Sequence, residues 1–352
     1  MLKVCQCVKN FSPVGGMEGY VWNLTHELIE QNIKVVVICE KYHKHYNSEI
    51  EIKLIENKKK ITSSWVNHLI FSAKVEKLIK QNEYFFKNYI IHSHERLNVH
   101  HITTLHGPLI LDRRKRIFDF FSLRLFFWKI LEKRELSSSN VTCIVPNSNF
   151  TRDKVKFFYP QIKSAICYPG YPGVKGEFYQ IPNKSEVFNF GFIGKEWKRK
   201  GLLFALEVYK EVYKIRPDIH LHIAGVEINA VKSFLVDMPE HSYTFYGWTD
   251  SKDFFEKIEV LLHPALNEPY GMVASEANAS GVFCLISKYV GFKDFIETGV
   301  GEVLDLDKKQ WVDAILKLIG KKIPVKRINF SWQELTSEYI KLYAMLDNLH
   351  NN

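Results

Sequence analysis

The first forty residues alternate between short apolar runs and one amphipathic segment. The run from Leu2 to Val8 predicts a strand, a glycine turn follows it, and apolar positions recur at helical spacing from Glu18 to Gln31. The next run, KVVVICE, ends at Glu40 and is apolar at nearly every position, which is typical of a buried strand. A strand, a helix and a strand in this order predict a βαβ unit with parallel strands.

A similar alternation restarts in the second half of the chain. FNFGFIG at 188–194 predicts a strand, Leu202 to Ile215 a helix, and the runs IHLHIAGVE, YTFYGW and VLLHPAL further strands. Between the halves, Pro and Gly cluster in CYPGYPGVKGEFYQIPNK (167–184), where neither periodicity persists. We therefore predict two α/β domains, residues 1–170 and 171–352.

The end of the chain predicts one more amphipathic helix, in NFSWQELTSEYIKLYAMLDNL. Ser331 can cap its first turn. The apolar residues near one face are Trp332, Leu335, Tyr339, Leu342 and Leu346. The domain division given above places this helix with the second domain.

The composition of the chain favours one class of binding partner but does not identify a particular partner. Lys and Arg number 48 against 39 Asp and Glu in 352 residues, a formal charge of +9 that favours anionic partners. No run reaches the roughly 18 apolar residues that a spanning helix needs, and the N-terminus reads as a strand rather than a signal peptide. Six scattered cysteines without metal-ligand spacing predict reduced thiols in the core: Cys5, Cys7, Cys39, Cys143, Cys167 and Cys284.

Two acidic residues flank a Pro-Tyr-Gly turn in HPALNEPYGMVASEANASG (263–281). A helix that begins near Gly271 directs its free N–H groups and the positive end of its dipole toward this turn, where an anion can bind. Glu268 before the turn and Glu276 in the helix suit the hydroxyl pairs of one polyhydroxylated ligand. The alternative is that Glu268 only faces the helix dipole and Glu276 lies at the surface.

A basic cluster follows the strand that ends at Gly194. In GFIGKEWKRKG (191–201) four cations precede Gly201 and a helix: Lys195, Lys198, Arg199 and Lys200. At the carboxyl end of a parallel strand, such cations face the crevice where open α/β sheets bind ligands. The alternative is a solvated run of charge. The acidic stretch in the same half of the chain favours the ligand-binding interpretation.

The first half of the chain contributes a glycine pair and a histidine. Gly15 and Gly16 follow the first strand, but Val14 stands where a dinucleotide fingerprint needs glycine. We predict a flat loop that lets phosphates approach the backbone, with a plain tight turn as the alternative. His106 follows a Val/Ile/Thr-rich strand and precedes a Gly-Pro break, and a lone strand-end histidine is more often structural than functional.

No metal site is expected from the spacing of acidic residues and histidines. His94, His100 and His101 do not follow a zinc motif. The pair Asp305 and Asp307 precedes a predicted helix, where capping explains it better than metal binding.

A basic and aromatic segment, 113–135, reads as a helix suited to an anionic bilayer surface. A buried helix with basic ends is the alternative. No nucleic-acid recognition motif accompanies the cations, so nucleic acid is not an expected partner. The residues predicted to contact a membrane are Arg113, Arg114, Arg116, Phe120, Phe121, Phe127 and Trp128.

Together these segments resemble the retaining glycosyltransferases of family 4, which have the GT-B fold of two facing Rossmann-like domains. The resemblance extends over almost the whole chain, and EPYGMVASEANASG matches the family's Glu-x7-Glu motif. Two segments are most similar to the glucosyltransferases of the lipopolysaccharide core, GFIGKEWKRKG and LLHPALNEPYGMVASEANASG. The other matching segments are GGMEGYVWNLTHELIEQNIKVVVI, TTLHGP, PNSNFTRDKV and YPGYPGV.

The resemblance implies roles for individual residues. Glu268 would hold hydroxyls of the donor sugar and Glu276 those of the ribose. Arg199 and Lys200 would neutralise the diphosphate, and His106 would lie near the transferred sugar. The remaining nucleotide-sugar contacts implied are Gly15, Gly16, Gly194, Trp248 and the backbone N–H groups of Gly271, Met272 and Val273.

The resemblance also implies an activity and a location. The first domain would bind the acceptor and the second the nucleotide sugar, with a C-terminal helix that crosses back to the first domain. The reaction would be metal-independent transfer of a hexose, glucose from UDP-glucose, with retention, to a saccharide or glycolipid at the inner face of the cytoplasmic membrane. Two alternatives remain: mannosyl or N-acetylhexosaminyl transfer, and an inactive nucleotide-sugar-binding subunit.

Overall fold

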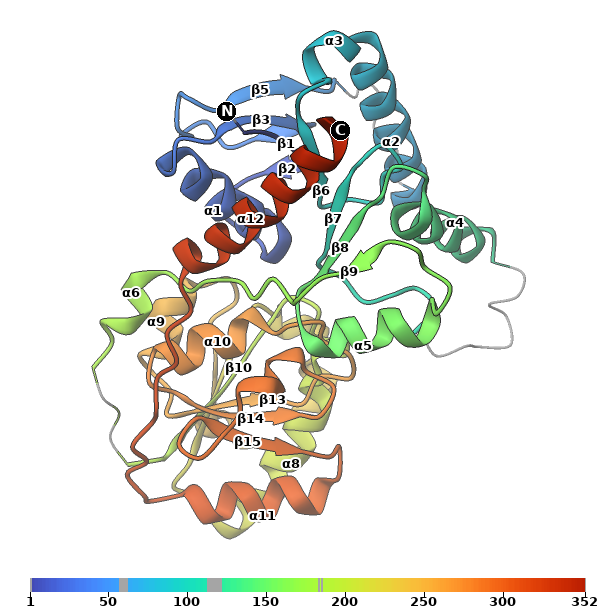
Figure 1. The fold of residues 1–352 in the computed structure, drawn as a ribbon. Coiled ribbons are helices and arrows are strands. Elements are labelled where there is room, and N and C mark those ends of the chain that lie inside the picture. The colour runs from blue at the N-terminus through green and yellow to red at the C-terminus, as the bar shows by residue number, and fades with distance from the viewer. Residues whose placement is uncertain (1, 57–62, 113–121, 183, 185, 352) are drawn as a thin grey trace. The chain divides into compact units, whose positions relative to one another are not determined.

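The apolar runs form two separate parallel β-sheets in the computed structural model, which describes residues 2–56, 63–112, 122–182, 184 and 186–351 (Figure 1). Each sheet is the centre of one compact unit. Unit 1 comprises Met1–Gly173 and Ser331–Asn352, and unit 2 comprises Val174–Phe330. The prediction of two Rossmann-like α/β domains is confirmed.

The division lies between Gly173 and Val174, inside the Pro- and Gly-rich segment 167–184 and not after residue 170. The C-terminal helix, which the sequence-based division groups with the second domain, belongs to unit 1. The reason is its apolar face, which packs on the core of that unit.

Unit 1 contains a seven-stranded parallel sheet in the order β5-β3-β1-β6-β7-β8-β9, and a short parallel pair, β2 with β4. Strand addition reverses direction between β1 and β6, so the carboxyl ends of these two strands flank a switch point. The strands are β1 Lys3–Cys7, β2 Asn10–Phe11, β3 Lys34–Cys39, β4 Lys41–Tyr42, β5 Glu51–Leu54, β6 Ile90–Ser93, β7 Ile102–Leu105, β8 Cys143–Pro146 and β9 Ala165–Ile166. The helices are α1 Gly16–Glu30, α2 Ser64–Gln81, α3 Glu83–Phe86, α4 Leu123–Ser137, α5 Asn149–Phe158 and α12 Trp332–Asn351.

Helices cover both faces of this sheet, which explains why its central strands are apolar at successive positions. Val4 of β1 packs in the cluster formed with α1 and α12, whereas its neighbour Cys5 packs in the cluster formed with α2 and α3. Successive side chains of a strand point to opposite faces, so both positions must be apolar. All six cysteines are free thiols, and five of them are buried.

Unit 2 contains a six-stranded parallel sheet in the order β12-β11-β10-β13-β14-β15. Its switch point lies between β10 and β13. The strands are β10 Asn189–Ile193, β11 His220–Ala224, β12 Tyr243–Phe245, β13 Val260–His263, β14 Phe283–Ser287 and β15 Gly301–Leu304. The helices are α6 Gly176–Tyr179, α7 Trp197–Lys200, α8 Leu202–Ile215, α9 Ser251–Phe255, α10 Met272–Ala279 and α11 Lys308–Leu318.

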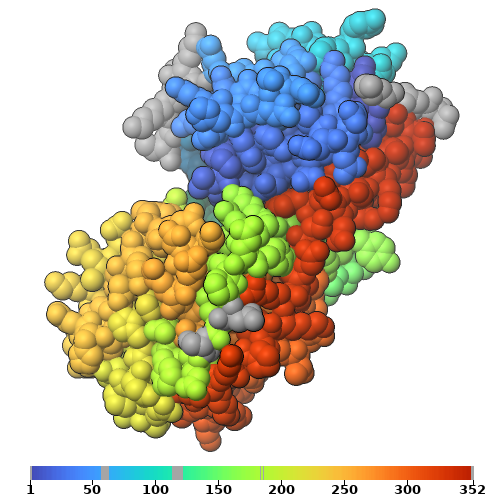
Figure 2. Space-filling model, turned by 90° about the vertical axis from the view of Figure 1, so that its left-hand side faces the viewer, coloured from blue at the N-terminus to red at the C-terminus, as the bar shows by residue number. Residues whose placement is uncertain are grey.

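The C-terminal helix α12 lies beside α1 (Figure 1), and red C-terminal atoms lie directly against blue N-terminal atoms within unit 1 in Figure 2. The predicted cap is present, because Ser331 Oγ accepts a hydrogen bond of 3.2 Å from the N–H of Glu334. Leu346 is fully buried, and Tyr343, outside the predicted face, is buried as well. The last helix therefore completes the core of the unit that the first strand begins.

The packing of α12 predicts a large loss of stability for Leu346→Ala. Leu346 is 0% exposed in the cluster shared with α1, so we expect the variant to lose about 2 to 5 kcal/mol of unfolding free energy. Leu349 on the same helix is 61% exposed, and Leu349→Ala should stay within about 0.5 kcal/mol of the wild type. Chemical denaturation of both variants measures this difference. Equal stabilities would contradict the assignment of α12 to the core.

Candidate active site

The predicted site residues of unit 2 follow two neighbouring strands at the switch point of its sheet. Strand β10 is followed by Gly194 and the basic segment that ends at Gly201, and β13 is followed by the loop from Pro264 to Gly271. Because β10 and β13 are hydrogen-bonded parallel neighbours, both loops leave the same edge of the sheet side by side. The fold thereby brings the cationic and the acidic motif together.

Gly201 allows these two loops to approach each other, and Gly194 makes room for a side chain within the first loop. Gly201 has φ 84°, and a Cβ atom there would lie 2.0 Å from the carbonyl oxygen of Pro264. At Gly194 a Cβ atom would lie 2.4 Å from Cδ of Lys200. A hydrogen bond of 2.8 Å from the N–H of Leu266 to the carbonyl of Arg199 joins the loops directly. Glycine is needed at position 201, because φ is positive there and the backbone of Pro264 occupies the space of the Cβ, whereas at position 194 the space is occupied by the Lys200 side chain.

Arg199 ties the two loops together through its guanidinium group. Nη1 donates to the carbonyl of Asn267 at 2.6 Å and to Oε2 of Glu268 at 3.0 Å. On its other side, Nε and Nη2 donate to Oε2 of Glu196 at 2.9 and 2.5 Å. Burial would lower the pKa of Arg199, but the carboxylates of Glu268 and Glu196 raise it above its usual value. The guanidinium group therefore stays charged and fixed in place.

Glu268 lies among further cationic and basic groups. Lys200 Nζ is 3.9 Å and His263 Nε2 4.0 Å from Oε2 of Glu268. His263 is fully buried, and burial, with the nearby charges of Lys200 and Arg199, holds its pKa well below the usual value. The imidazole is therefore neutral, and Lys200 and Arg199 are the positive charges nearest this carboxylate among the described residues.

The helix that was predicted near Gly271 begins there. Gly271 has φ 97° and precedes α10, and no side chain caps the helix. The N–H groups of Met272 and Val273 stand in its uncapped first turn, where the positive end of the helix dipole lies. The backbone of Glu268 is fixed on both sides, because its N–H donates to Tyr289 O and its carbonyl accepts from the N–H of Gly291, each at 2.9 Å.

Glu276 stands in the second turn of α10, as predicted, and is partly buried. Burial raises its pKa to about 7, Lys200 and Lys175 lower it, and Asp250 and Glu177 raise it further. Its carboxyl group has no hydrogen-bond partner within the described part of the chain. The Glu276 carboxyl group is therefore a poorly solvated hydrogen-bond acceptor, and the charge of Lys200 acts on its pKa.

Trp248 lies in the loop after β12 and is 67% exposed. Lys195 Nζ lies 5.0 Å from the centroid of its ring, a cation–π contact. Lys195 follows β10, so this contact links an exposed aromatic face to the same loop that carries Arg199.

The predicted residues of unit 1 follow β1 and β7. Gly15 has φ 115° and precedes α1, and Gly16 is the first residue of that helix. His106 directly follows β7, and its Nε2 lies 2.8 Å from Nδ1 of His94. The Tyr20 ring on α1 packs edge-on against His106, with centroids 4.8 Å apart. Burial lowers the pKa of His106 to about 3, so this imidazole is neutral at neutral pH.

The predicted membrane segment is only partly within the described residues. Arg113, Arg114, Arg116, Phe120 and Phe121 lie outside them. Phe127 on α4 stacks on Trp65 with centroids 4.5 Å apart.

Trp128 on the same helix is 8% exposed, and Cζ of Arg96 lies over its ring, 5.0 Å from the ring centroid. The prediction of a membrane contact at Trp128 is therefore wrong, because its ring is packed within unit 1.

Three residues of the unit 2 site were not predicted as site residues. Glu196 and the carbonyl of Asn267 hold Arg199, and His263 lies beneath Glu268. Glu196 stands within the basic run, and an acid inside a cluster of cations is the one available sequence signal for such a partner. The backbone carbonyl of Asn267 leaves no signal in the sequence.

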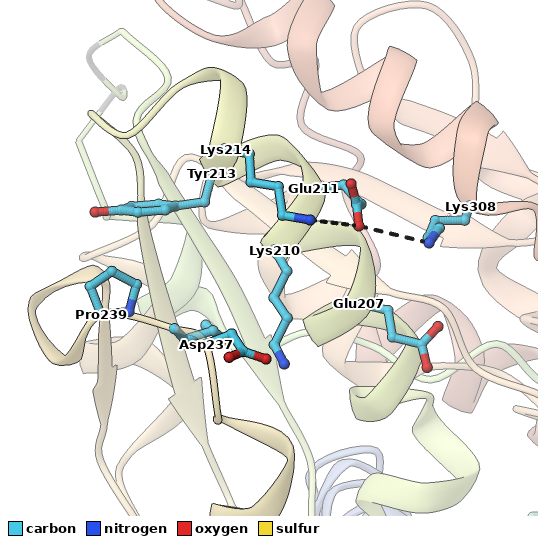
Figure 3. Close-up of a pocket in the computed structure, with 9 residues that line it drawn as sticks. Glu207, Lys210, Glu211, Tyr213, Lys214, Asp237, Pro239 and Lys308 are labelled. Atoms are coloured by element: carbon cyan, nitrogen blue, oxygen red, sulfur yellow. Dashed lines mark hydrogen bonds and ion pairs between the residues drawn. The ribbon is translucent and has the colours of Figure 1, made fainter.

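A surface hollow of about 200 Å³ lies on unit 2, away from these residues in sequence (Figure 3). Its lysines already have partners: Lys214 and Lys308 lie 3.2 and 3.9 Å from the same Glu211 oxygen, and Lys210 donates to the carbonyl of Val236. The described part of the chain holds no group of three side chains that could bind a metal. Asp307 caps α11 by accepting from the N–H of Gln310.

Comparison with known proteins agrees with this arrangement. The family model described as "Glycosyltransferase Family 4" matches residues 14–172, and that described as "Glycosyl transferases group 1" matches residues 187–321. The two matches together cover well over half of the chain. The chain belongs to the family 4 glycosyltransferases.

Individual relatives are distant. A 41.2 kDa protein of the cps region of Klebsiella pneumoniae, described as uncharacterized, is 26% identical over 46% of this chain and 47% of its own length. A D-inositol 3-phosphate glycosyltransferase of Corynebacterium urealyticum is 21% identical over 48% of this chain and 45% of its own length. The chain thus matches about half the length of these curated relatives. One glycosyltransferase of Methanocaldococcus jannaschii, 22% identical, matches over 95% of this chain and 96% of its own.

Solved structures show the same fold over the whole chain. WaaG, a glycosyltransferase involved in lipopolysaccharide biosynthesis, superposes with a TM-score of 0.79 over 99% of this chain and 98% of WaaG, at 16% identity. Sucrose-phosphate synthase of Thermosynechococcus elongatus superposes with a TM-score of 0.77 over 98% of this chain and 99% of the synthase, at 15% identity. The family 4 chain described here therefore has the GT-B fold. Among its described helices, none is long and apolar enough to cross a bilayer.

The raised pKa of Glu276 predicts a pH-dependent stability. Below about pH 4.5 the carboxyl group is protonated in both the folded and the unfolded chain. Between about 4.5 and 7 the unfolded chain loses this proton first, so the folded chain loses stability as the pH rises. Glu276→Gln removes the ionisation, and its stability relative to wild type should improve by about 1 to 3 kcal/mol between pH 4.5 and 8.

Chemical denaturation of the wild type and of Glu276→Gln at about pH 4.5 and about pH 8 measures this change in unfolding free energy. The exposed Glu207→Gln serves as control and should show no such trend. A difference between Glu276→Gln and wild type that does not vary with pH would show that the carboxyl group is not held in its neutral form.

Proposed function

We propose that this protein is a retaining glycosyltransferase that moves a hexose, glucose from UDP-glucose, to a saccharide or lipid-linked acceptor. The observation that carries the proposal is the cluster at the switch point of unit 2. There Arg199 and Lys200 flank Glu268, 3.0 and 3.9 Å from the same oxygen, beside the uncapped first turn of α10. Two fixed cations and a helix N-terminus bind a diphosphate well.

The reaction follows from where charge develops. When the bond between the sugar and the diphosphate breaks, negative charge grows on the leaving phosphate. Arg199 and the N–H groups of Met272 and Val273 are held in place before the reaction, so they stabilise that charge without reorganising, and Lys200 adds a second positive charge 3.9 Å from Glu268. Metal ions have no part in this scheme.

The carboxylates bind hydroxyl groups in this proposal. Glu268 accepts from the donor sugar, because Arg199 already fixes one of its oxygens and the backbone on either side is pinned. Glu276 accepts from the ribose hydroxyls, and Trp248 lies against the base. Neither carboxylate serves as a nucleophile. The acceptor hydroxyl attacks on the face of the leaving group, and the leaving phosphate takes its proton, which retains the configuration.

Related structures support the nucleotide proposed. HepE of Anabaena has been solved with UDP and glucose, at 14% identity and a TM-score of 0.64. TarM of Staphylococcus aureus has been solved with UDP and α-GlcNAc-glycerol, at 12% identity and a TM-score of 0.71. The likeness to WaaG supports a role in lipopolysaccharide or envelope polysaccharide assembly. The sugars in these two structures differ, so the sugar of this protein is decided by the donor test below. Mannosyl transfer, N-acetylhexosaminyl transfer and nucleotide-sugar binding without transfer are its other possible outcomes.

Membrane association rests on the exposed face of α4. Leu123 and Phe126 are 71% and 58% exposed there, with Arg124, Lys129 and Lys133 on the same helix. Exposed apolar side chains among cations suit the surface of an anionic bilayer. We place the protein at the inner face of the cytoplasmic membrane, where a lipid-linked acceptor is available.

Calorimetric titration with UDP, GDP, UDP-glucose and GDP-mannose in the presence of a chelator tests the donor site. We expect UDP and UDP-glucose to bind, and Lys200→Ala to weaken that binding by about 10- to 100-fold, because a charged hydrogen bond to phosphate is lost. Lys198→Ala removes a neighbouring exposed cation that lies over Trp197 and should leave binding nearly unchanged.

Each other outcome has a defined meaning. Tight binding of GDP-mannose in place of UDP-glucose would indicate mannosyl transfer. Binding of UDP-glucose without transfer to any acceptor would indicate a binding subunit. If none of the four nucleotides binds, the donor-site proposal is wrong.

Flotation with vesicles that contain anionic phospholipid tests the membrane proposal. The wild type should float with the vesicles at low salt, and the double variant Leu123→Ser with Phe126→Ser should float severalfold less, since it loses the apolar contact. Tyr84→Ser, at a 94% exposed position on α3, is the matched control and should float like the wild type. Wild-type protein that remains entirely in the unbound fraction would refute membrane association.

A further inference from the structure

A continuous chain of hydrogen bonds runs through the core of unit 1 from His106 to the carbonyl of Gly170. We call it the His106 relay. It has eight links, with donor–acceptor distances from 2.6 to 3.3 Å. In order, its members are His106, His94, Gln6, Tyr343, His92, Thr104, Tyr339, Tyr20 and the carbonyl oxygen of Gly170.

The fold explains why these polar groups meet inside a core. Gln6, His92 and Thr104 stand on the adjacent strands β1, β6 and β7, and Gln6 and His92 are register partners. Helix α12 supplies Tyr339 and Tyr343 against this part of the sheet. Because all of these groups are buried, each needs a partner within the protein.

The carbonyl of Gly170 sets the direction at one end of the relay. A carbonyl oxygen can only accept, so the hydroxyl of Tyr20 donates to it at 3.1 Å. Tyr20 has then used its single proton and must accept from the hydroxyl of Tyr339 at 2.9 Å. By the same reasoning Tyr339 accepts from Thr104 at 2.6 Å, and Thr104 accepts from Nε2–H of His92 at 2.8 Å.

The direction continues through the second half. Burial holds the pKa of His92 well below its usual value, so the ring is neutral and its Nδ1 accepts from the hydroxyl of Tyr343 at 2.6 Å. Tyr343 accepts from Nε2 of Gln6, and Oε1 of Gln6 accepts from Nε2–H of His94 at 2.7 Å. His94, also neutral through burial, can then only accept at Nδ1, so His106 donates from Nε2 at 2.8 Å.

Reversing any part of the relay breaks a link. Each member contributes one proton to one link, so a reversed segment leaves two lone pairs facing each other at hydrogen-bond distance. A buried acceptor without a donor is unfavourable. One arrangement of protons therefore satisfies all eight links with the Gly170 carbonyl as the final acceptor.

We propose that the His106 relay fixes His106 as the Nε2–H tautomer, so that its Nδ1 accepts a hydrogen bond from a hydroxyl group of the bound substrate. Tyr339 and Tyr343 are then positioning residues, which act on His106 from the C-terminal helix through Thr104, His92, Gln6 and His94. The identity of the hydroxyl-bearing ligand rests on the proposed glycosyltransferase function. The assignment of the His106 tautomer does not depend on that proposed function.

Two observations at His106 agree with this assignment. Its Nδ1 has no hydrogen-bond partner among the described residues, and the His106 side chain belongs to a partly buried residue. The pKa near 3 keeps the ring neutral at neutral pH, so the ring has a single proton, and with that proton on Nε2 the Nδ1 atom carries a lone pair. His106 is thereby an acceptor that orients a hydroxyl and not a general acid.

Nitrogen NMR of histidine-labelled protein tests the proposal directly, with the signals assigned by His→Asn variants. Protonated and unprotonated ring nitrogens differ in chemical shift, so each tautomer is read without any substrate. In the wild type we expect the Nε2–H form at His92, His94 and His106. A predominant Nδ1–H form at His106 would overturn the proposal, whether or not the protein transfers a sugar.

Tyr343→Phe tests the relay at a distance, since Gln6 and His94 stand between Tyr343 and His106 in the relay. It removes the acceptor of Gln6 and the donor to His92, so the Nδ1–H fraction of His106 should rise severalfold. Tyr209→Phe is the matched control: its buried hydroxyl bonds the carbonyls of Ile219 and Ser242 in unit 2, and the tautomer of His106 should not change. An unchanged His106 in Tyr343→Phe would show that the relay does not control it.

Kinetics give a second readout if the protein transfers glucose. Tyr343→Phe should raise the KM for the substrate whose hydroxyl group His106 binds by about 3- to 10-fold with a smaller effect on kcat, because that hydrogen bond is weakened. Tyr339→Phe, which breaks the relay between Thr104 and Tyr20, should behave alike. If one variant fails to fold, the other variant and the wild-type spectrum still decide the question.

Discussion

The link that Arg199 makes between two strand ends is the constraint on which the candidate site depends. One guanidinium group hydrogen-bonds the carbonyl of Asn267 and the carboxylate of Glu268 while Glu196 holds its other edge. A cation and an anion this close, partly withdrawn from water, keep each other oriented. The loops after β10 and β13 consequently present one connected polar surface at the switch point.

Backbone requirements and electrostatics reinforce each other at this surface. Gly201 lets the basic segment come so close to Pro264 that no side chain fits between them, and Gly271 turns the chain into α10 with a positive φ. The turn leaves the first N–H groups of α10 uncapped beside two cations. A site that concentrates positive potential in this way binds phosphate oxygens and also stabilises a phosphate that leaves.

Much of this architecture could be predicted from sequence, because it depends on local patterns. Helix α8 has the predicted bounds Leu202–Ile215, and α10 begins after Gly271 as its turn sequence indicates. What could not be predicted depends on contacts between distant residues. The hydrogen bond between Gln6 and Tyr343 joins positions 337 apart, and the polar residues that it connects read in sequence as ordinary strand and helix positions.

Burial explains the remaining differences between sequence and structure. Aromatic residues next to cations favour a membrane surface in the sequence, but Trp128 packs beneath Arg96 inside unit 1. The assignment of α12 to unit 1 likewise follows from a buried apolar face, whose partner a periodic pattern cannot name. A pattern of apolar residues predicts that a face is buried and leaves open what buries it.

The central claim is that the first turn of α10, with Arg199 and Lys200, binds the diphosphate of a nucleotide sugar. Its most direct test follows the backbone amides of Met272 and Val273 by NMR while UDP-glucose is added. The account predicts that these two amides shift strongly and saturate with the ligand, as hydrogen bonds to phosphate form. Saturable binding that leaves both amides unmoved would contradict it, because the diphosphate would then be held elsewhere.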